Sequence, residues 1–146
     1  MESPAAESET SKVFGQATYD MGLPGRLFRG TKRLLGESSN ERITVFQRNF
    51  RLVALVTPIL VRICDSLRQV SGSADHASIG YPVEFEGHEK NRNELGLKRL
   101  QEAYTHAGIL RQHLCPEPVA AAISYLNQNT IVDRSLILTL DFGGGT

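Results

Sequence analysis

A cluster of glycines follows an apolar stretch at residues 135–140 of this 146-residue chain. Asp141 is followed by Gly143, Gly144 and Gly145, and then by Thr146. Glycine N–H groups are unobstructed by side chains and can surround phosphate oxygens. The carboxylate can hold a divalent cation directly or through water, and the threonine hydroxyl can donate to a phosphate. The pattern therefore predicts a phosphate-binding loop, with a plain glycine turn in a hairpin as the alternative.

A second candidate is a carboxylate fixed between two prolines, where residues 115–118 read Cys-Pro-Glu-Pro ahead of Val-Ala-Ala-Ala. Each proline fixes its own φ angle and restricts the residue before it, so Glu117 has little conformational freedom. That suits a residue that must position a water molecule or a metal ion. The alternative is that Glu117 only neutralises the positive end of the helix that follows.

The second half of the chain predicts the elements that would position these groups. Strands are expected at 77–81, 109–114 and 135–140, with helices over 89–107 and from Pro118 to Leu126. The strand at 135–140 is continuously apolar, as in strands buried on both faces of a sheet. Alternating strands and helices indicate an α/β fold.

The first half gives weaker signals. We expect a short basic helix over 27–36 that ends at Gly36, then a strand or hairpin over 42–50. Apolar residues at helical spacing predict a helix over 52–67, which either begins at Pro58 or begins earlier and kinks there. Nine basic and three acidic residues lie between positions 21 and 68, so this region presents either a solvated helical face or an anion-facing surface.

Composition narrows the class of protein. Sixteen Lys and Arg balance sixteen Asp and Glu, so net charge gives no argument for nucleic acid or a membrane surface. No run of about 18 apolar residues predicts a spanning helix. Only Cys64 and Cys115 are present, which favours a reduced, cytoplasmic setting over a disulfide scaffold.

Residues 1–23 read as a disordered or loop segment, and residues 24–146 as one domain. A glycine cluster straight after an apolar strand seldom ends a natural domain, so we expect a truncated piece of a larger protein.

Taken in order, these motifs resemble the nucleotide-binding domain of the seventy-kilodalton heat-shock chaperone family, within the actin-like ATPase superfamily. The resemblance spans about residues 24–146. The matching segments are 31–36 (Thr-Lys-Arg-Leu-Leu-Gly), 78–82 (Ser-Ile-Gly-Tyr-Pro), 116–122 (Pro-Glu-Pro-Val-Ala-Ala-Ala) and 141–146 (Asp-Phe-Gly-Gly-Gly-Thr). The resemblance implies part of an actin-like, ribonuclease H-like ATPase lobe, an incomplete mixed sheet with flanking helices. It implies ATP or ADP with Mg²⁺ as cofactors.

Family roles transfer only onto the matched positions. Lys32 corresponds to a lysine implicated in cleavage of the γ-phosphate, and Glu117 to a glutamate that helps to order the metal and the attacking water. Asp141 corresponds to a carboxylate near the divalent ion. The glycines at 143–145 and Thr146 correspond to the second phosphate-binding loop, with Thr146 close to the γ-phosphate. The resemblance thus implies Lys32, Glu117 and Thr146 as catalytic residues, and Asp141 and Glu117 as metal-site residues.

Other positions match or depart from the family. Pro82 corresponds to a proline that relays nucleotide state between lobes, although it also serves as a simple strand terminator. Residues 1–23 lack the family's first phosphate loop, Pro116 replaces an asparagine, and Val119 replaces a threonine. We therefore expect this chain alone not to hydrolyse ATP at a family-like rate.

The implied partners are nucleotide and, through missing regions, unfolded polypeptide clients and co-chaperones, without nucleic acid or membrane. The alternatives are another actin-like ATPase or kinase and a non-catalytic interaction module that retains the fold. A dinucleotide-binding fold is disfavoured because no later glycine stands at the required spacing.

Overall fold

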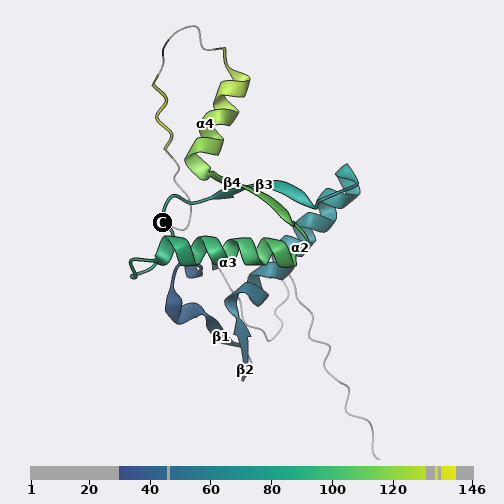
Figure 1. Ribbon diagram of the computed structural model, residues 1–146, viewed down its shortest axis with the longest axis vertical. Coiled ribbons are helices and arrows are strands. Elements are labelled where there is room, and N and C mark those ends of the chain that lie inside the picture. Colours follow the sequence, from purple (N-terminus) through teal and green to yellow (C-terminus); the bar gives the residue numbers. More distant parts are fainter. Residues whose placement is uncertain (1–29, 46, 131–133, 135, 141–146) are drawn as a thin grey trace, which may run out of the picture.

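A computed structural model describes residues 30–45, 47–130, 134 and 136–140 of the chain (Figure 1). Over these residues the fold is mixed α/β, with three α-helices, one antiparallel strand pair and one parallel strand pair. The elements are the 3-10 helices η1 (Thr31–Leu34) and η2 (Ser38–Asn40), the strands β1 (Arg42–Val45), β2 (Arg48–Arg51), β3 (His76–Tyr81) and β4 (Arg111–Pro116), and the helices α2 (Leu52–Ser71), α3 (Arg92–His106) and α4 (Glu117–Gln128).

The β3–β4 pair is parallel and is connected through α3, because parallel strands need a crossover. Figure 1 shows α3 between this pair and the β1–β2 hairpin, with α2 crossing beside it. The predicted strands at 77–81 and 109–114 are confirmed as strands, although β4 begins at Arg111. Ile109 and Leu110 are not part of the strand because their N–H groups have other partners. The N–H of Ile109 donates to the Tyr104 carbonyl at the end of α3, and the N–H groups of Leu110 and Arg111 both donate to the Asp75 carbonyl.

The core lies between α2, α3 and β3. Along α2 the buried positions recur at helical spacing, α2 packs on α3, and Ala103 of α3 is completely buried. Leu52, Cys64 and Ile109 are almost completely buried. The buried apolar residues are Leu35, Leu52, Val53, Val56, Leu60, Cys64, Ala74, Ile79, Phe85, Ala103, Ala107 and Ile109.

Two predictions about the first half are settled. The hairpin is confirmed, with Ile43 opposite Phe50 in its register. Helix α2 begins at Leu52 and contains Pro58, so a start at Pro58 is wrong. The helix tolerates this proline because the carbonyl that loses its usual N–H partner belongs to Ala54, which is exposed and can be hydrated. Thr57 also donates its hydroxyl to the Val53 carbonyl at 2.8 Å within the same turn.

The predicted basic helix over 27–36 is only partly described. Residues 27–29 lie outside the described part, and the rest forms the short 3-10 helix η1 followed by a turn at Leu35 and Gly36. The turn is tight because the Leu35 N–H bonds to the Lys32 carbonyl, only three residues back. An α-helix that continues to Gly36 is therefore wrong.

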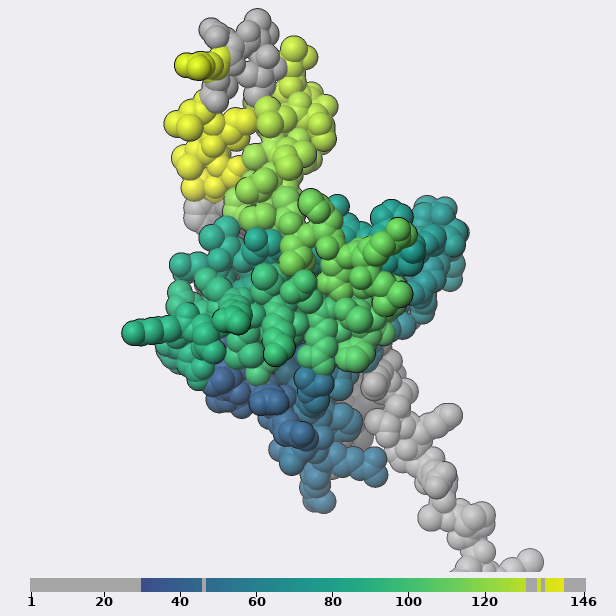
Figure 2. Space-filling model, in the orientation of Figure 1, coloured from purple at the N-terminus to yellow at the C-terminus, as the bar shows by residue number. Residues whose placement is uncertain are grey.

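The buried strand predicted at 135–140 is also wrong for the described residues 136–140. They form no strand, and Leu136, Leu138 and Leu140 are 99%, 79% and 67% exposed. An apolar strand is buried only where it pairs with a sheet, and among the described residues β3 and β4 pair only with each other. Figure 2 shows this end of the molecule, with α4, standing clear of the body. No helix in the described part is both long and apolar enough to cross a membrane.

Candidate functional site

Two of the residues singled out from the sequence meet in the fold. The ammonium Nζ of Lys32 lies 2.6 Å from the Oε1 atom of Glu117, although the residues are 85 positions apart. Lys32 comes from η1, and Glu117 is the first residue of α4. The fold thus joins the amine and the carboxylate that the family resemblance implies as catalytic residues.

Glu117 is placed by the end of β4. That strand stops at Pro116, and Pro118 then lies in the first turn of α4, where a missing N–H has no cost. The register sets Gly80 opposite Cys115 and Tyr81 opposite Pro116. A β-carbon on Gly80 would lie 3.4 Å from Cγ of Glu117, so the glutamate lies over the carboxyl end of β3. Ligands of open α/β sheets bind at this edge.

Lys32 is placed by the turn around η1. Gly30 adopts a left-handed conformation, with φ of 58°, and its carbonyl accepts the N–H of Arg33 at 2.9 Å. The Arg33 Nε atom then donates to Oε2 of Glu86 at 2.8 Å. Ser38 hydrogen-bonds Glu89 from the other side of the turn. Lys32 is therefore carried on a turn that is fastened to the loop following β3.

Gly36 explains how closely these two segments approach. A β-carbon there would lie 2.2 Å from the Glu86 carbonyl oxygen and 2.9 Å from Cβ of Phe85. Gly87 in the loop after β3 allows the same close approach, because a β-carbon on it would lie 2.8 Å from the Gly36 carbonyl oxygen. The sequence interpretation of Gly36 as a helix stop missed this role. The signal that was present is the glycine itself, since glycine often marks close approach of two backbones.

The ion pair is accessible to solutes. The side chains of Lys32 and Glu117 are 56% and 31% exposed, so an anion can reach the ammonium and compete with the carboxylate.

Partial burial raises the pKa of Tyr104 on α3, and the negative charge of Glu117 raises it further. The ammonium can neutralise a growing negative charge, and the carboxylate can accept a hydrogen bond from a water molecule.

The remaining predicted site residues are not tested by the structure. Asp141, the glycines at 143–145 and Thr146 lie outside the described residues. Pro82 directly follows β3. Across the part of the chain that is described, no group of three or more His, Cys, Asp or Glu side chains is placed to hold a metal ion. Glu117 alone does not make a metal centre.

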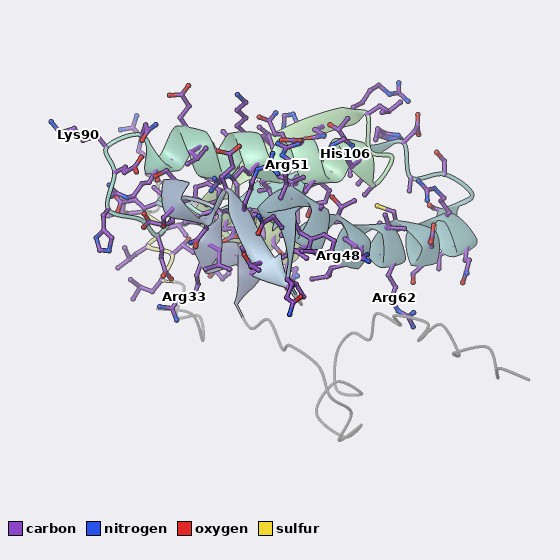
Figure 3. The ribbon with its side chains drawn as sticks, turned by 90° about the horizontal axis from the view of Figure 1, so that it is seen from below. Arg33, Arg48, Arg51, Arg62, Lys90 and His106 are labelled. Atoms are coloured by element: carbon purple, nitrogen blue, oxygen red, sulfur yellow. The ribbon has the colours of Figure 1, made fainter. Side chains whose placement is uncertain are left out.

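The basic surplus between positions 21 and 68 favours the solvated-face interpretation. Arg33, Arg51 and Arg68 each form an ion pair, with Glu86, Glu102 and Asp65 respectively. Figure 3 shows Arg33, Arg48 and Arg62 spread along the length of the molecule and not gathered at one place. The described basic residues of this region, from Lys32 onward, therefore do not form a single anion-facing surface.

Comparison of the chain with protein-family models, with curated proteins and with solved structures finds no match.

Proposed function

We propose that this chain carries the Lys32–Glu117 part of an ATP-binding site of the actin-like kind, similar to that of the seventy-kilodalton heat-shock chaperones. The observation that supports the proposal is the 2.6 Å contact between Nζ of Lys32 and Oε1 of Glu117. The resemblance assigns Lys32 to cleavage of the γ-phosphate and Glu117 to ordering of the metal and the attacking water. Local sequence alone gives no reason for residues 32 and 117 to be neighbours.

The position of the pair also supports the proposal. Glu117 lies where β3 and β4 end together, and Gly80 beneath it leaves space that a side chain would occupy. A nucleotide at the carboxyl ends of parallel strands would bring its phosphates to this edge. The exposed ammonium of Lys32 is then available to a phosphate oxygen.

The two side chains would divide the work of phosphoryl transfer. Lys32 would stabilise the negative charge that develops on the transferred phosphoryl group, where catalysis rests on positioning and electrostatics. Glu117 would accept a hydrogen bond from the attacking water and so orient it. A phosphate would have to draw Lys32 away from Glu117, which frees the carboxylate for that water.

Magnesium would supply neutralisation of the phosphate charge when bound. Its holders in the proposal are Glu117, through water, and Asp141, because Mg²⁺ gives up its hydration reluctantly. In the wider proposal the chain is a fragment of a chaperone ATPase domain whose nucleotide state changes the angle between two lobes. Polypeptide clients and co-chaperones would then bind through other regions.

Amide chemical shifts measured during titration with Mg²⁺-ATP test the proposal. We expect shifts centred on Lys32, Gly80 and Glu117 at millimolar nucleotide, and their loss in Lys32→Ala and Glu117→Gln. Lys98→Ala is the matched control, because Lys98 is an exposed lysine on α3. No shift at millimolar nucleotide, or shifts centred away from these three residues, would contradict the proposal and favour a non-catalytic interaction module.

A further inference from the structure

Arg99, near the middle of α3, is a charged residue with only 6% of its surface exposed. Its Nη1 atom donates to the carbonyl oxygen of Leu35 at 2.9 Å and to that of Glu37 at 2.7 Å. These two carbonyls lie on either side of Gly36, in the turn that follows η1. The buried guanidinium of Arg99 on α3 thus holds in place the segment that carries Lys32.

The burial of this guanidinium is costly. Desolvation lowers the pKa of Arg99, while the charges of Glu41 and Glu102 raise it and that of Arg51 lowers it. Among the described residues, the partners of its hydrogen bonds are main-chain carbonyls and not a carboxylate. Buried charges of this kind are weak sources of stability, and in some proteins they are retained because they fix one arrangement over others. The arrangement fixed here is the position of residues 35–37 on α3.

A short path of hydrogen bonds leads from Arg99 to Lys32. Arg99 holds the Leu35 carbonyl, and the Leu35 N–H donates to the Lys32 carbonyl at 3.3 Å. The Leu35 side chain is 2% exposed, so it anchors the same turn in the core. The turn can therefore move little without breaking the contacts of Arg99.

We propose that Arg99 is a positioning residue that holds the turn of residues 31–37 so that Lys32 meets Glu117. Its importance for nucleotide chemistry rests on the proposed function, whereas its effect on the ion pair does not. Arg99 touches neither Lys32 nor Glu117 by any hydrogen bond of the described residues and acts through the main chain of the turn. A purely structural arginine would support the fold without setting the distance between those two side chains.

Carbodiimide cross-linking measures that distance directly, because this reagent joins an amine to a carboxylate only when the two are in contact. The product is an amide bond between Lys32 and Glu117, with the lost water taken up by the carbodiimide, and mass spectrometry of peptides gives its yield. The measurement uses the full chain and no nucleotide. Its outcome is therefore independent of whether the chain binds ATP.

Three variants make the measurement specific. In Arg99→Gln we expect a yield lower by about threefold or more, because the turn then populates other positions. Arg99→Lys keeps a positive donor near the carbonyls and should restore most of the yield. Arg68→Leu is the matched control. Arg68 also donates to a main-chain carbonyl, that of Ala107 at 3.2 Å, but this carbonyl lies just after the C-terminal end of α3. The yield in Arg68→Leu should equal that of the unmodified protein.

An unchanged yield in folded Arg99→Gln, or an equal loss in Arg68→Leu, would overturn the inference. If Arg99→Gln does not fold, the unmodified protein decides the question in sub-denaturing urea. Cross-link yield and hydrogen-exchange protection of the Leu35 and Glu37 amides should then decline together. A yield that outlasts this protection would overturn the inference as well. If the cross-linking results are as expected but Mg²⁺-ATP causes no amide chemical shifts, only the proposed function is contradicted.

Discussion

The aromatic ring of Phe85 occupies the space that a β-carbon on Gly96 would need. Such a carbon would lie 2.4 Å from Cγ and 2.5 Å from Cδ1 of the ring. Phe85 also donates its N–H to Asn93 at 2.8 Å, and its carbonyl accepts from Arg92. The loop after β3 is thereby fixed to the first turns of α3. The same loop carries Glu86, the partner of Arg33 beside Lys32.

This packing predicts that Gly96→Ala destabilises the protein. Alanine within a helix normally gains about 0.5–1 kcal/mol over glycine. Here the added methyl group overlaps a ring that is 3% exposed, and overpacking of this kind costs about 1–3 kcal/mol. Urea denaturation measures the free energy of unfolding, with Lys98→Ala on the exposed face of α3 as the control. A Gly96→Ala protein as stable as the parent would contradict the described position of Phe85.

Lys32→Ala should separate stability from function. The ion pair is largely solvated, so its loss should lower the free energy of unfolding by less than about 1 kcal/mol. In a form of the protein that hydrolyses ATP, the same change should lower the chemical step far more than nucleotide affinity, because a lysine at the γ-phosphate acts chiefly in the transition state. Single-turnover kinetics and nucleotide titration give the two quantities. Equal losses of rate and affinity would argue against the assigned role.

The lowered pKa of Asp75 predicts that the fold loses part of its stability at low pH. The Ser73 hydroxyl, followed by Arg111 and His76, holds the pKa of this carboxyl well below its usual 3.8. Above that value the carboxylate is charged in both states and its native contacts stabilise the fold. As pH falls below it, the unfolded chain takes up a proton that the folded chain does not, so the contribution declines.

The melting temperature of Asp75→Asn, measured from neutral pH to about pH 2, tests this expectation. The variant should melt below the parent at neutral pH, and the gap should shrink as the pH falls. Asp65→Asn is the control, because Asp65 pairs with Arg68 within one helix. A gap that stays constant over this range would contradict the prediction.

Leu138 and Ile109 test the fate of the apolar segment at 136–140. Leu138 is 79% exposed and Ile109 is 2% exposed. Leu138→Ala should therefore change the free energy of unfolding by less than about 0.5 kcal/mol. Ile109→Ala should cost about 2–5 kcal/mol, the range for a large core side chain. A loss of several kcal/mol in Leu138→Ala would restore the buried strand predicted from the sequence.

Most of the local elements could be predicted from the amino-acid sequence. The hairpin over 42–50, the strands β3 and β4 and the helices α2, α3 and α4 follow from apolar spacing, from Gly108 after α3 and from Pro118 at the start of α4. Such signals are local, because they arise between residues a few positions apart that meet through the geometry of one helix or strand. They also marked Glu117, between its two prolines, whereas Lys32 was singled out by the family resemblance alone.

Contacts between residues far apart in the chain could not be predicted in this way. The contacts of Lys32 with Glu117, of Arg99 with the carbonyls of Leu35 and Glu37, and of Phe85 with Gly96 depend on how whole elements pack. The segment at 136–140 makes the same point in reverse. Its composition is that of a buried strand, yet its leucines stay exposed because burial depends on a neighbouring strand and not on the segment itself.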